Sequence, residues 1–196
     1  MKKLILFMFF CTAVFAQHQT SNPTAIDGVT NGLIVIDYPH HEIHSGDHYF
    51  IEGYATLGDG DSLRVKLVTP NTTKWAHFKW VIGSTGVLTT TFHEDASGGM
   101  ANGSPVTPLN NNRNSANTSG MTITSGVDEA TSEGTLLGNT KFGVASNPSK
   151  AIGGDSSRED ELILKQNAIY LRTFISGSAG NVVSFKAFFY EHTSRN

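Results

Sequence analysis

Apolar and polar residues alternate with a period of two along most of the chain after residue 32. Leu63, Val65 and Leu67, for example, alternate with Arg64 and Lys66, which is the pattern of a half-buried strand. The same reasoning predicts further strands at 33–37, 49–57, 75–82, 87–94, 121–124, 135–137, 161–165, 169–175 and 181–192. We therefore predict an all-β fold, a single antiparallel β-sandwich of the jelly-roll or immunoglobulin-like type with long Gly/Asn-rich loops.

Short connections between these strands predict local pairing. The turn at 83–86 joins two strands that we expect to form a hairpin or meander, and 166–168 is a hairpin-sized connection between the next such pair. Gly53 interrupts an otherwise apolar strand, where a bulge or a close backbone approach is expected. Trp75 and Trp80 have opposite parity on one strand, so one enters the core while the other faces outward.

The segment 96–120 has no periodicity and is rich in Gly, Pro and Asn. So long an irregular stretch inside a small domain is usually functional or is ordered by a partner. Asn110, Asn112, Arg113 and Asn114 lie within it, and with the outward Trp75 they are our candidate interface or ligand residues. Arg113 suits an interface because its planar guanidinium donates to carboxylates or backbone carbonyls.

The N-terminus has the layout of a secretory signal peptide. Two lysines precede an apolar run, and a small-residue cleavage site follows at Ala16. We expect a signal peptide at 1–16, a flexible N-terminal arm at 17–31 and the β-sandwich domain at 32–196. The alternative is an apolar arm that packs in an assembly. Export predicts an extracellular or cell-surface location, with no membrane attachment after cleavage.

Composition narrows the range of functions. The chain has 196 residues, which suits one β-sandwich, and only 16% of them are charged. The net charge of −3 and the absence of a basic stripe argue against a nucleic-acid partner. The single cysteine lies in the signal segment, so a cleaved chain would have to gain stability from its own core or from association with other copies.

The densest cluster of chemically versatile side chains is His40, Glu42, His44 and His48. On a strand, the first three share one face and could converge on zinc or nickel. The alternative, which we prefer, is a polar strand edge or an inter-subunit contact, where histidines could also respond to pH. These four residues are therefore weak metal candidates, and we expect no metal and no cofactor.

Nothing in the sequence indicates catalysis. It contains no nucleophile elbow, phosphate-binding loop or dinucleotide fingerprint. We expect His77, His93 and His192 to be outward polar residues on separate strands, and the acidic run at 159–161 to be solvated charge. The chain is therefore expected not to be an enzyme, and we assign it no catalytic residues.

Five blocks of the sequence together span about 40–192: His41–Gly46, Thr69–Phe78, Pro108–Ser115, Glu161–Leu171 and Phe189–His192. These blocks, in this order, resemble those of a poorly characterised family of small tailed-bacteriophage virion proteins. The resemblance implies a structural β-domain, a head-associated or decoration protein located in the virion, with no catalytic residues to carry over. The signal peptide departs from that pattern, because virion proteins normally assemble in the host cytoplasm.

Two functions follow as expectations. The first is a non-enzymatic structural protein that self-associates, or binds capsid or other structural proteins, through its loops and arm. The second is a secreted surface or extracellular-polymer module that binds glycans or acts as an adhesin, using an outward Trp and the Asn-rich loop.

Overall fold

The computed structural model describes residues 38–143, 152–154 and 160–193, all within one compact unit, Tyr38–Asn196. The expected signal peptide, N-terminal arm and strand at 33–37 lie outside the described residues. Within the described part, no helix is long and apolar enough to cross a membrane.

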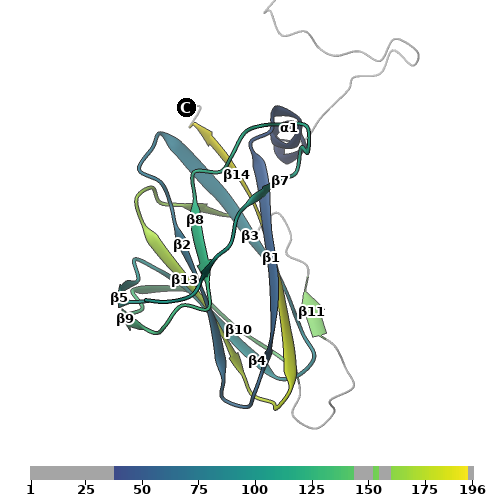
Figure 1. The fold of residues 1–196 in the computed structure, drawn as a ribbon, viewed down its shortest axis with the longest axis vertical. Helices are drawn as coiled ribbons and strands as arrows, with labels where there is room; N and C mark the ends of the chain where they lie inside the picture. Colours follow the sequence, from purple (N-terminus) through teal and green to yellow (C-terminus); the bar gives the residue numbers. More distant parts are fainter. Residues whose placement is uncertain (1–37, 144–151, 155–159, 194–196) are drawn as a thin grey trace, which may run out of the picture. The chain divides into compact units, whose positions relative to one another are not determined.

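Two antiparallel sheets form the domain (Figure 1). Sheet 1 has the order β11 (Ile152–Gly154), β3 (Lys74–Ser84), β14 (Asn181–Thr193), β1 (His48–Leu57) and β7 (Leu109–Asn110), and β12 (Leu162–Leu164) also pairs with β3. Sheet 2 has the order β10 (Thr135–Phe142), β4 (Leu88–Glu94), β13 (Ile169–Ser176), β2 (Ser62–Val68), β8 (Thr122–Ser125) and β6 (Ser104–Pro105). The all-β antiparallel sandwich predicted from the sequence is confirmed.

The strands β1 to β4 belong alternately to sheet 1 and sheet 2, and β12 and β13 also lie in different sheets, which overturns both predicted hairpins. β3 belongs to sheet 1 and β4 to sheet 2, and β12 and β13 are divided in the same way. The connections at 83–86 and 166–168 therefore cross between layers. Alternation of apolar residues shows that a strand has one buried face, but it does not specify which neighbour pairs with the strand.

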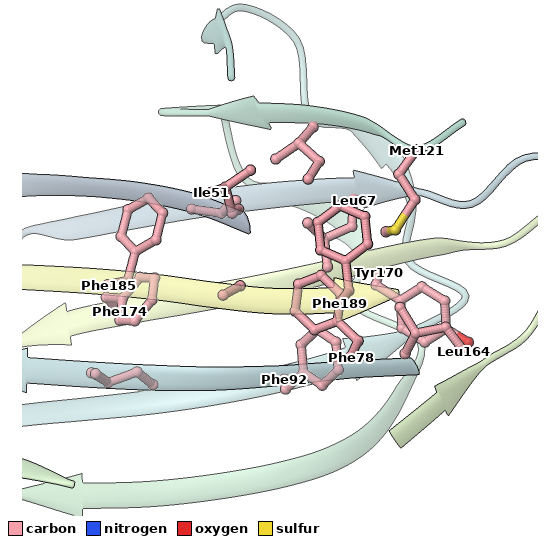
Figure 2. Close-up of a cluster of buried hydrophobic side chains, with 14 of the residues drawn as sticks. Ile51, Leu67, Phe78, Phe92, Met121, Leu164, Tyr170, Phe174, Phe185 and Phe189 are labelled. Atoms are coloured by element: carbon pink, nitrogen blue, oxygen red, sulfur yellow. The ribbon is translucent and has the colours of Figure 1, made fainter. Parts of the chain in front are cut away.

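Aromatic side chains from both sheets fill the space between them (Figure 2). On β14, Phe185 and Phe189 point inward, as their parity predicts, and both are almost fully buried. Phe189 stacks on Phe78 of β3 at 5.4 Å between ring centroids, and Phe185 stacks on Phe174 of β13 at 5.6 Å. Full burial of each such side chain stabilises the fold by about 1.5–3 kcal/mol, so this layer supplies the main driving force for folding.

The outer face of sheet 2 has a cover of its own. β5 (Ser97–Gly99) pairs with β9 (Ala130–Ser132), and a second small apolar cluster lies beneath this pair. The cluster joins Met100 and Val127 to Leu171, which points outward from β13. The segment 96–120, expected to lack regular structure, thus contributes the short strands β5, β6 and β7.

One helix, α1 (Tyr38–Ser45), precedes β1. Pro39 lies in its first turn, where its missing N–H costs nothing. Gly46, at a φ of 81°, ends the helix: its N–H donates to the Ile43 carbonyl, and the Asp47 N–H donates to the Glu42 carbonyl at 3.0 Å. This is a Schellman motif. The strand expected to carry His40, Glu42 and His44 is therefore a helix.

Candidate functional site

The β5–β9 pair covers the outer face of sheet 2. Among the described elements, nothing covers the outer face of sheet 1 in this way, except near α1. We define this outer face by the outward side chains of three adjacent strands, which the pairing register places side by side: Phe50, Glu52, Tyr54 and Thr56 on β1; Ser184, Lys186 and Phe188 on β14; Lys79 and Val81 on β3. Tyr54 is 79% exposed, the highest exposure of any large apolar side chain in the described part. Phe188 and Phe189 are adjacent on β14, so they point to opposite faces, and the outward Phe188 lies on this surface.

Cations cap the aromatic rings of the outer face. The Lys186 Nζ atom lies 4.6 Å from the centroid of Phe50 and 5.0 Å from that of Phe188. Lys79 approaches Phe188 from β3, and Lys186 also pairs with Glu52 at 3.5 Å. Such cation–π contacts are worth about 0.5–1 kcal/mol at exposed sites. The face therefore combines apolar rings with charges of both signs.

The second edge of β1 is open over most of its length. β14 pairs with β1 from His48 to Leu57, whereas β7 pairs only with Tyr49 and Phe50, at the end near α1 (Figure 1). From Ile51 to Leu57, no described strand pairs with this edge. Open strand edges are sites where another strand can add.

The hydrogen-bond pattern shows which backbone groups face this open edge. On the β14 side, the Glu191 N–H donates to the Asp47 carbonyl at 3.0 Å, and on the β7 side, the Asn111 N–H donates to the His48 carbonyl at 2.9 Å. Successive residues of an antiparallel strand direct their backbone groups to opposite sides. The N–H and C=O groups of Glu52 and Tyr54 therefore point away from β14, as do those of Thr56, toward the open edge.

A polar network lies at the end of this sheet near α1. The Nδ1 atom of His77 is 2.5 Å from Glu161 Oε1, and the Tyr190 hydroxyl donates to the same oxygen at 2.8 Å. Nε2 of His77 lies 2.8 Å from Nε2 of His192, whose Nδ1 atom lies 2.9 Å from the Thr193 carbonyl. Glu161, Tyr190, His77 and His192 are thus joined in one continuous chain of polar contacts.

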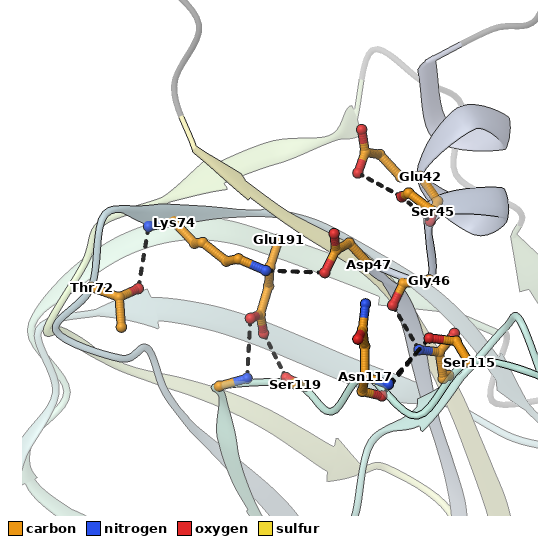
Figure 3. Close-up of polar contacts among 12 residues, drawn as sticks. Glu42, Ser45, Gly46, Asp47, Thr72, Lys74, Ser115, Asn117, Ser119 and Glu191 are labelled. Atoms are coloured by element: carbon orange, nitrogen blue, oxygen red, sulfur yellow. Dashed lines mark hydrogen bonds and ion pairs between the residues drawn. The ribbon is translucent and has the colours of Figure 1, made fainter.

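This network corrects the expectation of separate outward residues. The pairing of β14 with β3 brings His77 and His192 together, and Glu161 belongs to the network rather than to a solvated acidic run. Glu191 is also buried and accepts hydrogen bonds from Ser119 and from the Gly120 N–H (Figure 3). Nearby His48 is buried and stacks on Tyr190 at 6.1 Å, and burial lowers its pKa below the ordinary value.

The four weak metal candidates do not converge. Helix α1 places His40 and His44 on one exposed face, with their Nε2 atoms 3.0 Å apart. Glu42 faces the opposite way and is buried, where it bonds to Ser45 (Figure 3). His48 lies on β1. Among the described residues, no group of three or more His, Cys, Asp or Glu side chains has the geometry to hold a metal ion.

The Asn-rich loop makes hydrogen bonds to its own chain, and that a partner also binds it stays a prediction. Asn110 is buried, and its amide donates to the Gly46 carbonyl at 2.7 Å and to the Asn117 carbonyl at 3.1 Å (Figure 3). Asn112 donates to the His44 carbonyl at 3.1 Å. These two side chains fasten the loop to α1, while Arg113 and Asn114 are exposed.

The two tryptophans divide as their parity predicts, although neither is fully exposed. Trp80 packs on the core, and Trp75, opposite His192, is half-buried. Tyr54, not Trp75, is the prominent outward ring. Its position could have been found in the sequence, because it shares the outward parity of Phe50 and Glu52 in the strand at 49–57.

Comparison with known proteins adds no relative. A scan against protein-family models gives no match, and searches of the curated proteins and of the solved structures give none either. The resemblance to tailed-phage virion proteins stays a prediction from the sequence blocks.

Proposed function

We propose that this chain is a non-enzymatic structural domain that assembles with a second copy of itself through the open edge of β1. The observation that supports this best is the edge of β1 from Ile51 to Leu57, with which no strand of the described residues pairs, beside the exposed Tyr54 ring. A strand added there gains main-chain hydrogen bonds, while the side chains of the outer face supply specificity. The resemblance to virion proteins favours the same class of function.

A second copy fits this edge because antiparallel pairing of β1 with itself satisfies the backbone groups that face it. A two-fold axis at Tyr54 places the two Tyr54 rings opposite each other and Glu52 opposite Thr56 of the other copy. No like charges then face one another across the pair. Each copy offers the same patch, as a closed two-fold dimer requires.

The length of the open run sets the limits of this pairing. On the N-terminal side of the run, β7 pairs with β1 at Tyr49 and Phe50. On the C-terminal side, the chain turns at Gly58, after Leu57, and leads to sheet 2. The run between these limits lies within the usual strand length of about 3–10 residues.

The experiment compares Tyr54→Pro with Tyr54→Val by sedimentation velocity over a wide range of protein concentrations. Proline removes an N–H that faces the open edge and leaves the ladder to β14 intact, so we expect Tyr54→Pro to be monomeric. Valine retains the N–H, so Tyr54→Val should still dimerise, more weakly. Circular dichroism verifies that both variants fold. A monomeric wild type, or a folded Tyr54→Pro variant that dimerises like wild type, would contradict the proposal.

A glycan-binding module is the second candidate, and the exposed ring of Tyr54 is the observation that favours it. An aromatic ring on a flat sheet can stack on the apolar face of a sugar. In that case wild type would be retained on a glycan array, Tyr54→Ala would not, and Tyr54→Pro would leave the oligomeric state unchanged.

A further inference from the structure

His40 and His44 are arranged for a ligand that the assembly function does not use. They lie one helical turn apart on α1, where residues four apart share a face. Their rings stack at 4.9 Å, their Nε2 atoms are 3.0 Å apart, and both side chains are exposed. In the absence of a metal, one imidazole must donate its hydrogen to the other, because neutral rings share a single N–H in this contact.

We propose that His40 and His44 together bind a divalent transition-metal ion, with Cu²⁺ preferred, and that water completes its coordination. Bonds of about 2.05 Å to two nitrogens 3.0 Å apart enclose an angle of about 94° at the metal. That angle fits the square-planar or tetragonal sites of Cu²⁺ and Ni²⁺ better than the tetrahedral sites of Zn²⁺. The metal takes the place of the shared hydrogen, which moves to Nδ1 of its own ring so that both Nε2 lone pairs face the metal.

The surroundings of α1 hold this pair toward solvent. Glu42 on the opposite side is buried and bonded to Ser45, and Asn112 donates to the His44 carbonyl. The Schellman motif at Gly46 fixes the end of the helix. His41, although adjacent in sequence, turns away, stacks on Tyr38 and contacts Glu42. Orientation of the ligands by such contacts strengthens metal binding.

A second histidine pair could compete for the metal and provides a control. His77 and His192 have their Nε2 atoms 2.8 Å apart, but Nδ1 of His77 is engaged by Glu161 and the pair is half-buried. A metal there would have to displace the hydrogen bond between the rings within a network already satisfied by protein groups. We therefore assign the metal to the exposed pair.

The test is titration of tag-free protein with Cu²⁺, Ni²⁺ and Zn²⁺ by calorimetry at mildly alkaline pH, where imidazole is neutral. All proteins carry His18→Ala, which removes the one histidine outside the described residues. We expect one Cu²⁺ per chain, affinities in the order Cu²⁺, Ni²⁺, Zn²⁺, and at least about a tenfold loss in His40→Ala and in His44→Ala.

His41→Ala and His192→Ala are the matched controls and should bind Cu²⁺ as the His18→Ala protein does. Electron paramagnetic resonance of the Cu²⁺ complex should show nitrogen ligation that is lost in His44→Ala, and circular dichroism verifies the fold of each variant. The proposal is overturned if the His18→Ala protein binds no stoichiometric Cu²⁺, if His41→Ala weakens binding as much as His44→Ala, or if His192→Ala abolishes it.

Discussion

The ring of Phe185 lies over Gly53, its partner on the neighbouring strand, so closely that a Cβ atom at Gly53 would come 2.7 Å from Phe185 Cζ. The sequence predicted a bulge or a close backbone approach at this glycine, and the structure instead places an aromatic side chain over it. The register of β1 against β14 runs through Gly53 without a shift, so there is no bulge. Phe185 cannot easily move aside, because it is buried between Phe174 and Trp80.

We predict that Gly53→Ala lowers the free energy of unfolding by about 1–3 kcal/mol, the usual cost of overpacking a core. Gly138→Ala on β10 is the matched control, because nothing lies within 4 Å of its added methyl group. Urea unfolding of both variants measures the difference. Equal stability of the two variants would show that Phe185 moves aside at little cost in free energy.

Asn110→Ala should destabilise the domain by about 1–3 kcal/mol, the cost of leaving buried polar partners unsatisfied. The change removes the donor to the Gly46 and Asn117 carbonyls and the acceptor for the Asn112 N–H. Thermal unfolding checks this against exposed Asn114→Ala, which should be nearly neutral. For the same reason, deleting residues 110–115 should destabilise the domain. If Asn110→Ala unfolds at the same temperature as wild type, the side chain of Asn110 does not anchor the loop to α1.

The buried His48 predicts loss of stability in mild acid. Burial lowers its pKa below the ordinary value of about 6.5, so as the pH falls the unfolded chain binds the proton first. The free energy of unfolding should therefore fall below about pH 6.5. In His48→Gln, which cannot titrate, the slope should be shallower, whereas exposed His41→Gln should retain it. Urea unfolding at a series of pH values gives these slopes; equal slopes in wild type and His48→Gln would contradict the prediction.

Arg172 is a cation inside the sandwich. Its guanidinium carbon lies 5.7–5.8 Å from the ring centroids of Trp80, Phe92 and Phe174, and among the described residues it has no carboxylate partner. Burial lowers its pKa to about 10. The rings offset part of the cost of removing the charge from water, but an apolar side chain of similar length avoids that cost altogether.

We therefore predict that Arg172→Met unfolds at the same temperature as wild type or higher. Arg172→Lys should unfold lower, because the ammonium lacks the planar group that stacks on aromatic rings. Differential scanning calorimetry measures both. A clear loss of stability in the Met variant would show that the contacts with the three rings outweigh the cost of burying the charge.

The strands could be predicted from the sequence because one face of each is buried, as for Phe185 and Phe189 on β14. Their pairing could not, because alternation is the same whether Gly83–Gly86 connects strands within a sheet or across the sandwich. Helix α1 was missed because it has no apolar stripe, yet Pro39 in its first turn and Gly46 after its end were available signals.

The candidate site was predicted less well than the fold. Asn110 and Asn112 were singled out as interface or ligand candidates, and in the structure their amides bond to backbone carbonyls of the same chain. We placed His40, Glu42 and His44 on one face of a strand. In the helix, His40 and His44 share a face and Glu42 lies on the opposite side. The open edge of β1 could not be predicted, because it depends on β7 stopping after two residues, a tertiary feature without a local signal.

The position of β14 has a consequence for how the domain is made. It is the last strand described, yet it lies between β1 and β3, pairing with both along most of its length (Figure 1). Until the residues from Asn181 onward have been synthesised, β1 and β3 have no partner between them, and the core lacks the rings of Phe185 and Phe189. A nascent chain in this state exposes strand edges that invite aggregation. Sheet 1 can therefore close only after β14 has been synthesised, and we expect a chaperone that shields the waiting edges to increase the yield of folded domain.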